Sequence, residues 1–447
     1  MLGEYRISGR RASEISASVE RAVGEGELEP GQLLPPMREL AAQLGVNPNT
    51  VASAYRTLRE RGVIETAGRR GSRIRARPVS TARESIRADV PEGVRDLSKG
   101  NPDTALLPPL RDALLYAAEQ ADATPGLYGE EARDPELVRL ARADFDAAGV
   151  PDGPVAVASG SLDAIERVLA VHLKPGDTVA VEDPGWGAML DLVPALGLRA
   201  VPVAVDDEGP LPDEVERALR GGARAVVVTA RAQNPTGAAV SAERAVALRE
   251  VLAAHPSVLL VEDDHGHGIV DLPVHVLAGA GGGPWVFVRS VSKGYGPDLR
   301  VAVLTGDAVT VDRVRGRQRL GPGWVSRLLQ RAVVRLWTSG VVDADVVARS
   351  YGERRDTLVA ALAERGVRAH GRSGMNVWVP VADETGVVSR MLYAGWGVAP
   401  GARFRVAAGA GVRLTVSTLS VGEIGVVADA VAAAIGPGPE GEGRRYG

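Results

Sequence analysis

Residues 288–300 read VRSVSKGYGPDLR and place a lysine, Lys293, in a chain that uses arginine almost everywhere else. Only three of the chain's 52 lysine and arginine residues are lysines. A guanidinium stays charged and cannot act as an amine nucleophile, whereas a desolvated lysine can lose its proton and condense with a carbonyl compound. A solvated surface lysine is the ordinary alternative, so the other motifs of the chain decide between the two.

The composition indicates a globular protein of several domains. The chain has 447 residues, 45% of them apolar and 24% charged, and no cysteine, which excludes disulfides, thiolate metal sites and cysteine nucleophiles. No run approaches the roughly 18 apolar residues of a membrane span, and the charged N-terminus lacks a secretory signal, so a cytoplasmic protein without membrane contact or metal is expected. Residues 1–78 carry a net charge of +4 although the whole chain carries −4. This asymmetry indicates different partners for the two parts.

The basic first part has the pattern of a winged helix-turn-helix. Apolar spacing predicts one helix over residues 13–24, a second over MRELAAQL, and a third in NPNTVASAYRTLRERG that Asn47 caps. The expected inner face of the third helix is formed by Val51, Ala54, Tyr55 and Leu58. The following VIETAGRRGSRIRAR is typical of two short strands around a basic tip.

Residues 26–74 resemble the winged helix of the GntR-type bacterial regulators, and the resemblance covers about residues 1–76. A Pro-Gly turn, a Leu-Pro followed closely by Arg, and a recognition helix that opens on Thr-Val carry it. The resemblance implies operator DNA as a partner, with the recognition helix in the major groove and the wing on phosphates. It places near DNA the residues Arg38, Asn49, Thr50 and Arg56, with Arg69 and Arg70 on the wing. The alternative is a protein-interaction module with a solvated run of charge.

The second part has the pattern of an α/β domain. Residues 77–95 show no sustained period and are expected to form a linker. Beyond them, short β-branched runs such as VAVASG and SVLLVEDD alternate with helical segments, which predicts βα units and a mostly parallel sheet. Open α/β sheets bind ligands at the carboxyl ends of their strands. The expected strand ends carry a glycine turn before Ser161 and then the residues Trp186, Asn234 and Asp263. Each of these features also has an ordinary structural explanation, as part of a turn, the core or a loop.

The order and spacing of these motifs resemble the fold-type I aminotransferases, which use pyridoxal 5′-phosphate, from about residue 97 to 435. The family's Ser-x-Ser-Lys motif with a following Arg is matched by Ser290, Ser292, Lys293 and Arg300. The expected fold class is therefore α/β, with the winged helix-turn-helix followed by a fold-type I transferase whose large domain has a mostly parallel sheet. The expected domains are the winged helix at 1–76, the linker, the aminotransferase-like domain at 96–436 with a smaller C-terminal α+β part from about 326, and a flexible tail at 437–447.

The resemblance implies a role for each matching residue. Lys293 would form the internal aldimine with pyridoxal phosphate. The cofactor phosphate would be held by Ser290, Arg300 and the backbone of Ser161 and Leu162. Tyr128 would reach the phosphate of the partner subunit, which implies a homodimer.

The cofactor ring and the ligand have their own expected residues. Trp186 would stack on the pyridine face, Asn234 would bind the ring hydroxyl, and Asp263 would hold the ring nitrogen protonated. Arg413 would grip a substrate carboxylate with two hydrogen bonds. Two positions depart from the pattern: His265 stands where related regulators carry Tyr beside the ring hydroxyl, and Leu162 stands where Gln is common.

Both halves and their order resemble the MocR-type regulators. The implied function is a transcriptional regulator that senses an amino acid or amine, which displaces Lys293 to form an external aldimine and changes how the dimer holds DNA. The alternative is an active aminotransferase with a vestigial DNA-binding domain, because every group that the chemistry needs is present. A third reading, a DNA-binding scaffold without cofactor, requires Lys293 and Arg300 to be coincidences.

Overall fold

The chain folds into two compact units in the computed structural model, one containing residues 1–81 and the other containing most of the remaining chain. The structure describes residues 7–24, 27–28, 31–60, 63–66, 71–74, 83, 86 and 90–436. Arg69, Arg70, most of the expected linker and the tail at 437–447 lie outside the described residues. None of the helices described is both long and apolar enough to cross a membrane.

The first unit is a three-helix bundle with a hairpin. Its elements are α1 (Ala12–Gly24), α2 (Met37–Leu44), α3 (Pro48–Glu60), β1 (Ile64–Thr66) and β2 (Ser72–Ile74). The side chain of Asn47 accepts a hydrogen bond from the backbone N–H of Asn49 at 2.9 Å, which caps α3 as expected. Gly45 ends α2 with a φ of 65°, a left-handed conformation that glycine adopts without steric cost.

The expected inner face of α3 is buried. Its members, Val51, Ala54, Tyr55 and Leu58, are each at most 1% exposed and pack with α1 and α2. The hydroxyl of Tyr55 donates to the carbonyl oxygen of Pro35 at 2.8 Å and so ties α3 to the chain before α2. Strands β1 and β2 pair antiparallel with Ile64 opposite Ile74, and both isoleucines enter the same core. The helix-turn-helix and the flanks of the wing therefore form as predicted.

The second unit is built on an eight-stranded sheet. Its strand order is β4-β11-β10-β9-β8-β5-β6-β7. Strands β5, β8, β9 and β10 run parallel, while β11 is antiparallel to both of its neighbours. The strands are β4 (Val155–Ala158), β5 (Thr178–Asp183), β6 (Arg199–Asp206), β7 (Gly209–Pro210), β8 (Ala225–Thr229), β9 (Leu259–Asp264), β10 (Trp285–Ser290) and β11 (Ala302–Gly306). The central strands are buried along their whole length, as a sheet covered on both faces requires.

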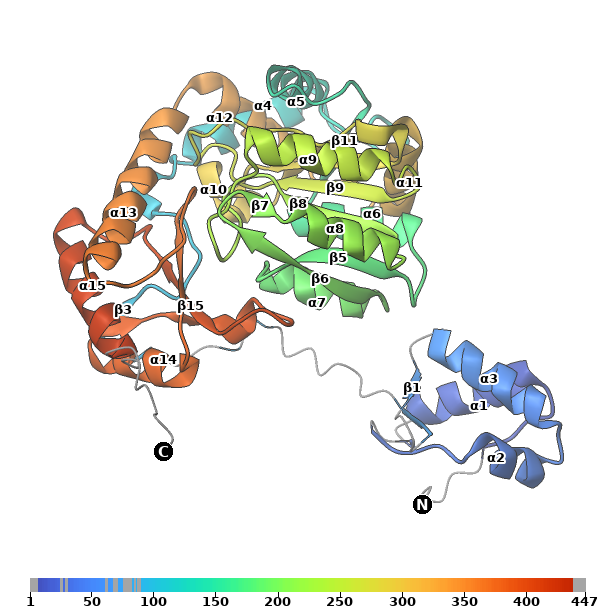
Figure 1. The fold of residues 1–447 in the computed structure, drawn as a ribbon. Coiled ribbons are helices and arrows are strands. Elements are labelled where there is room, and N and C mark those ends of the chain that lie inside the picture. The colour runs from blue at the N-terminus through green and yellow to red at the C-terminus, as the bar shows by residue number, and fades with distance from the viewer. Residues whose placement is uncertain are drawn as a thin grey trace, which may run out of the picture. The chain divides into compact units, whose positions relative to one another are not determined.

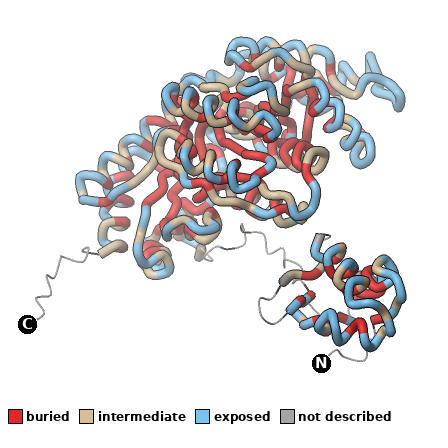
Figure 2. Tube along the Cα trace, turned by 45° about the vertical axis from the view of Figure 1, so that its right-hand side comes forward, coloured by how far each residue is buried: buried red, intermediate tan, exposed pale blue. Residues whose placement is uncertain are grey.

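Helices cover the sheet, with α8 and α9 in front of it in the view of Figure 1. The helices of this part are α4 (Arg111–Ala123), α5 (Pro135–Ala147), α6 (Ser161–His172), α7 (Gly187–Ala195), α8 (Pro212–Arg220), α9 (Ala242–Ala253), α10 (Ser292–Tyr295), α11 (Ala308–Arg319) and α12 (Arg327–Ser339). Short 3-10 turns lie at η3 (Thr104–Leu106), η4 (Ala280–Gly282) and η5 (Pro297–Leu299). Figure 2 shows the buried chain, in red, concentrated along the strands beneath these helices.

A smaller α+β part follows with its own apolar core. It contains α13 (Ala344–Glu364), β12 (Asn376–Pro380), α14 (Glu384–Tyr393), β13 (Trp396–Gly397), β14 (Ala399–Pro400), η6 (Gly401–Arg403), β15 (Gly411–Thr415) and α15 (Val421–Ile435), and β13 pairs with β3 (Arg95–Asp96). Buried residues of α12 belong to the core of the large sheet, whereas those of α13 belong to the second core. Along the chain, the second core thus begins to receive residues after α12, and the expected boundary near residue 326 remains a prediction.

Candidate cofactor and ligand site

The sheet brings the predicted cofactor residues to one edge. Ser161 follows β4, Trp186 follows β5, Asn234 follows β8, Asp263 lies near the end of β9, and Lys293 follows β10. These five strands run in the same direction, because β4 and β10 are both antiparallel to β11, which separates them. Their carboxyl ends, where open α/β sheets bind ligands, therefore meet at one edge.

The phosphate side of this edge is a cradle at the start of α6. Gly160 has a φ of 103°, and a Cβ added to it would lie 2.7 Å from the guanidinium of Arg300. Arg300 itself adopts a left-handed conformation and donates to the carbonyl oxygen of Ser159 at 2.7 Å. The buried hydroxyl of Ser161 has no hydrogen-bond partner within the described part of the chain. A helix N-terminus, an unsatisfied hydroxyl and an arginine together fit a phosphate.

Ser290 and Ser292 precede Lys293 at the end of β10. The side chain of Ser290 is buried and accepts a hydrogen bond from the backbone N–H of Ser292 at 3.2 Å. This bond fixes the start of α10, the single turn that carries Lys293. Leu162, expected to contribute its backbone, lies in the first turn of α6 next to Ser161.

The ring side of the site is a pocket lined by Trp186 and Asp263. Val181, Glu182 and Thr229 also line it. Asp263 is 3% exposed, and its Oδ1 is buried without a hydrogen-bond partner among the described residues. A buried carboxylate oxygen without a donor costs free energy unless a ligand supplies one. The protonated nitrogen of a pyridine ring is such a donor, so the residues present fit pyridoxal phosphate.

Glu182, one of the residues that line this pocket, carries a buried carboxyl group. Burial raises the pKa of Glu182 to about 7, although hydrogen bonds from Thr229 and Gln233 oppose the rise. The backbone N–H and hydroxyl of Thr229 donate to it at 2.8 and 2.7 Å. Glu182 thereby ties the ends of β5 and β8 together, a role that the sequence did not reveal.

Lys293 and Arg413 converge on one short segment, residues 98–100. The ammonium of Lys293 donates to the carbonyl oxygen of Gly100 at 2.6 Å, and Arg413 donates to the carbonyl oxygen of Ser98 at 2.6 Å. Arg413 is 2% exposed and also donates to the side-chain oxygen of Asn234 at 2.9 Å. The amide nitrogen of Asn234 then remains oriented by this bond as a donor for a ring hydroxyl.

Arg413 also packs on an aromatic ring that the sequence analysis missed. Its guanidinium carbon lies 4.8 Å from the centre of the Phe404 ring. A Cβ added to Gly100 would lie 3.3 Å from the Arg413 guanidinium, so this glycine lets the segment approach the arginine. Backbone carbonyls carry no side-chain signature, and for this reason the role of residues 98–100 was not visible in the sequence.

His265 lies next to Asp263 at the end of β9, and its place beside a ring hydroxyl remains a prediction. Its Nδ1 lies 2.9 Å from Oδ2 of Asp263, and its Nε2 lies 2.9 Å from the carbonyl oxygen of Ala232. Its ring centre lies 6.3 Å from that of Trp186. Both ring nitrogens are therefore engaged by protein atoms.

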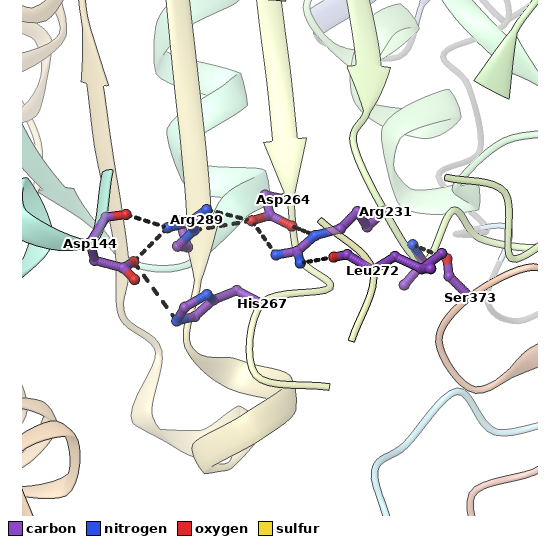
Figure 3. Close-up of polar contacts among 8 residues, drawn as sticks. Asp144, Arg231, Asp264, His267, Leu272, Arg289 and Ser373 are labelled. Carbon is purple, nitrogen blue, oxygen red and sulfur yellow. Dashed lines mark hydrogen bonds and ion pairs between the residues drawn. The ribbon is translucent and has the colours of Figure 1, made fainter. Parts of the chain in front are cut away.

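A buried charge network holds the strand ends behind the pocket (Figure 3). Asp264 is 0% exposed and accepts two hydrogen bonds from Arg231, at 3.0 and 2.8 Å, and two from Arg289, at 3.0 and 2.9 Å. Arg289 continues to the carboxylate of Asp144 at 2.6 Å, and His267 lies 3.9 Å from the same carboxylate. The two guanidinium groups outweigh the effect of burial and hold the pKa of Asp264 well below its usual range. Asp264 is thus an internal anchor rather than a solvated loop residue.

The remaining predicted residues lie elsewhere. Tyr128 is 91% exposed, and its ring packs edge-on against Trp324 at 5.5 Å. Tyr128 is not among the residues that line the pocket, and its reach to a partner subunit remains a prediction. In the first unit, Arg38 on α2 and Asn49 and Arg56 on α3 are exposed and Thr50 is half-buried. Their contact with DNA remains a prediction, as does the role of Arg69 and Arg70.

Comparison with known proteins identifies both parts of the chain. Residues 92–431 match the family "Aminotransferase class I and II", and residues 11–74 match "Bacterial regulatory proteins, gntR family". The chain is similar to the vitamin B6 salvage pathway transcriptional repressor PtsJ of Salmonella typhimurium, with 39% identity over 426 residues that cover 94% of this chain and 98% of PtsJ. It is also 31% identical over 262 residues to the pyridoxine biosynthesis transcriptional regulator PdxR of Corynebacterium glutamicum, covering 56% of each chain.

Solved structures share the fold of the second unit. LysN, the alpha-aminoadipate aminotransferase of Thermus thermophilus complexed with N-(5′-phosphopyridoxyl)-L-leucine, superposes with a TM-score of 0.67 at 24% identity. The match covers 77% of this chain and 92% of LysN. The two family matches and the similarity to PtsJ thus define a DNA-binding transcription regulator with an aminotransferase-like domain. The chain belongs to the MocR-type regulators, and the predicted fold class, both families and pyridoxal phosphate as cofactor are confirmed.

The charge network yields a first prediction. Arg289→Met removes two of the hydrogen bonds to Asp264 and leaves a buried carboxylate with less compensation. The free energy of unfolding of the second unit should fall by about 3–5 kcal/mol, the usual cost of breaking a buried ion pair. Urea denaturation followed by tryptophan fluorescence measures it. The control Arg139→Met removes an exposed pair with Glu136 on α5 and should change little; equal effects of the two variants would contradict the anchoring role of Asp264.

The phosphate cradle yields a second prediction. Gly160→Ala pushes the Arg300 guanidinium away, so pyridoxal phosphate should bind roughly tenfold or more weakly, a loss of about 1.4 kcal/mol or more. Titration of the cofactor with absorbance detection measures the affinity. Gly176→Ala is the matched control, because Gly176 also has a positive φ, of 96°, but its added Cβ meets no described atom within 4 Å. If both variants bind the cofactor equally well, Gly160 does not shape the phosphate site.

Proposed function

We propose that this protein is a pyridoxal-phosphate-dependent transcriptional regulator that senses an amino acid or related amine. Operator DNA binds the winged helix, and the ligand binds the pocket at the strand ends. One observation supports this assignment above the others. The ammonium of Lys293 and the guanidinium of Arg413 donate to carbonyls two residues apart, Gly100 and Ser98, so the amine and carboxylate positions of an amino acid are side by side.

Pyridoxal phosphate supplies an aldehyde that condenses with amines and a ring that accepts electrons. The chain's residues supply position and charge. Ser161, Ser290 and Arg300 would hold the phosphate, Asp263 would keep a proton on the ring nitrogen through Oδ1, and Lys293 would supply the amine of the protein that competes with a ligand amine for the aldehyde. Arg413 exchanges its hydrogen bonds with Asn234 and Ser98 for bonds to the ligand carboxylate.

A ligand alters DNA binding only if it binds one arrangement of the protein better than another. We propose that this arrangement involves a homodimer in which the exposed Tyr128 reaches the partner's site. The exchange at Arg413 is a differential contact of the required kind, since it removes a donor from the side-chain oxygen of Asn234 and leaves the carbonyl of Ser98 with the longer hydrogen bond from Arg403, at 3.5 Å. The side-chain oxygen of Asn234 then needs a new partner, which favours a rearrangement around it.

The names of two relatives indicate a candidate set of regulated genes. PtsJ is named for vitamin B6 salvage and PdxR for pyridoxine biosynthesis. These names support genes of vitamin B6 metabolism as the regulated targets. Binding of pyridoxal phosphate itself would then be a signal that the protein passes to its operator. The second candidate function is aminotransfer, which the completeness of the site favours.

A third prediction concerns the cofactor link. Borohydride treatment of the purified holoprotein should fix pyridoxal phosphate to Lys293, which peptide mapping detects. The chain offers only Lys99 and Lys174 as competing amines. Lys293→Ala should abolish the label while both other lysines remain; a label on either of them in the wild type would overturn the assignment.

A fourth prediction separates regulator from enzyme. Arg413→Ala should retain the visible absorbance of bound cofactor, because Lys293, Asp263 and the phosphate cradle remain to hold it, but lose the effect of an amino acid on operator binding. Removal of one partner of a desolvated charge pair costs about 2–5 kcal/mol, so the ligand affinity should fall at least about 30-fold. Fluorescence anisotropy of labelled operator DNA, with and without amino acids, measures the response.

The control for Arg413 is Arg244→Ala, which removes an arginine that is bonded to Asp206 and to two backbone carbonyls away from the pocket. It should respond to ligand like the wild type. Rapid multiple-turnover amino transfer by the wild type, together with no sequence-specific DNA binding, would favour the aminotransferase instead.

A further inference from the structure

His265 lies between two groups that accept hydrogen bonds. Its Nδ1 is 2.9 Å from Oδ2 of Asp263, and its Nε2 is 2.9 Å from the carbonyl oxygen of Ala232. The side chain of His265 is 15% exposed and that of Asp263 is 4% exposed, so water does not readily replace either partner.

The number of hydrogens that these two contacts require decides the protonation state of His265. A neutral imidazole carries one N–H and one bare nitrogen, whereas a carbonyl oxygen and an ionised carboxylate can only accept. Two hydrogens are therefore needed for the two contacts. Either the imidazole is an imidazolium, or the carboxyl group of Asp263 is protonated. The imidazolium is favoured because it places opposite charges across the 2.9 Å contact with Asp263, which the neutral pair does not.

The two acceptors are held in place by the surrounding structure. Ala232 has a φ of 56°, unusual for a residue other than glycine, and its N–H donates to the hydroxyl of Ser373 at 2.8 Å. Its neighbour Arg231 is clamped to Asp264 (Figure 3). Asp263 lies on β9 between Thr229 of β8 and Val288 of β10. Neither acceptor can turn away from His265 without disturbing the sheet or the network.

The charges around His265 favour the imidazolium. Burial disfavours its charged form, but the charge of Asp263 and the hydrogen bonds to Asp263 and Ala232 outweigh burial and the repulsion of Lys293 on α10. The pKa of His265 consequently lies above its ordinary value. Glu182 on β5 is the other carboxyl group of the pocket on which the charge of His265 acts, and it favours the ionised form of Glu182.

We propose that His265 is a positioning residue that is held as an imidazolium, binds Oδ2 of Asp263 and directs Oδ1 toward the ring nitrogen of the cofactor. The ring nitrogen therefore meets a carboxylate whose charge is already partly compensated. The inference rests on the proposed function only in that pyridoxal phosphate occupies this pocket; the protonation state of His265 does not depend on any effector or on DNA.

The direct test is nitrogen-15 NMR of full-length protein labelled on its histidine side chains, with and without pyridoxal phosphate. The His265 signals are assigned by their loss in His265→Gln among the six histidines of the chain. Both nitrogens of His265 should be protonated at pH 7 and should remain so at a higher pH than an ordinary histidine. One protonated and one bare nitrogen at pH 7 would overturn the proposal.

A second measurement uses the cofactor as the probe. His265→Gln removes a positive charge beside the cofactor, so the pH midpoint of the visible absorbance of bound pyridoxal phosphate should rise by roughly one unit. His267→Gln is the control, because His267 lies in the same loop and packs edge-on against Trp337 rather than on Asp263. An unchanged midpoint in His265→Gln, or an equal shift in His267→Gln, would refute the compensating charge.

Failure of the proposed function gives a different result. A wild-type protein that takes up no pyridoxal phosphate would refute the regulator proposal while the NMR measurement on the protein alone still decides the state of His265. Conversely, a neutral His265 in a protein that binds the cofactor and changes its operator binding in response to amino acids would refute only this inference.

Discussion

The buried contact of Asp264 with two arginines is the constraint on which the cofactor site depends. Burying a carboxylate without partners costs far more than the stability of a domain allows, so Asp264 requires both Arg231 and Arg289. These come from the segment after β8 and from β10, which flank β9 in the sheet. The clamp therefore sets the relative positions of three consecutive strand ends, and the functional residues Asp263, Asn234 and Lys293 lie within four residues of its members.

The adjacent carboxylates at the end of β9, Asp263 and Asp264, have different roles. Side chains of neighbouring residues on a strand point to opposite faces of the sheet. Asp264 consequently points into the charge network, while Asp263 points to the pocket with one oxygen bonded to His265 and the other without a partner among the described residues. Asp264 is held by its two arginines, so the end of β9 cannot shift to give the unsatisfied oxygen of Asp263 a partner.

The sequence predicted the fold class and the set of residues at the strand ends, because hydrophobic alternation and motif spacing are local signals. The three-stranded clamp around Asp264 was not predicted, since its partners lie 33 and 25 residues away and arginine is the commonest cation of this chain. The role of residues 98–100 was missed for another reason. Gly100 meets Lys293 across 193 residues through a backbone oxygen, which every residue possesses. The two hydrogen bonds of His265 were likewise not predictable from the sequence, because one of the acceptors is the backbone carbonyl oxygen of Ala232.

The charge of His265 bears on the difference between sensing an amine and transforming it. In the proposed function, binding of an amine would use the aldehyde of the cofactor, the phosphate cradle and Arg413. Transformation of the amine would also depend on how strongly the ring accepts electrons, which a fully charged carboxylate at the ring nitrogen favours. An imidazolium on the far oxygen of Asp263 weakens this effect without weakening the cradle. In the proposed arrangement, the groups that would hold a ligand are thus separate from Asp263, which would set how strongly the ring accepts electrons, and His265 would moderate the charge of Asp263.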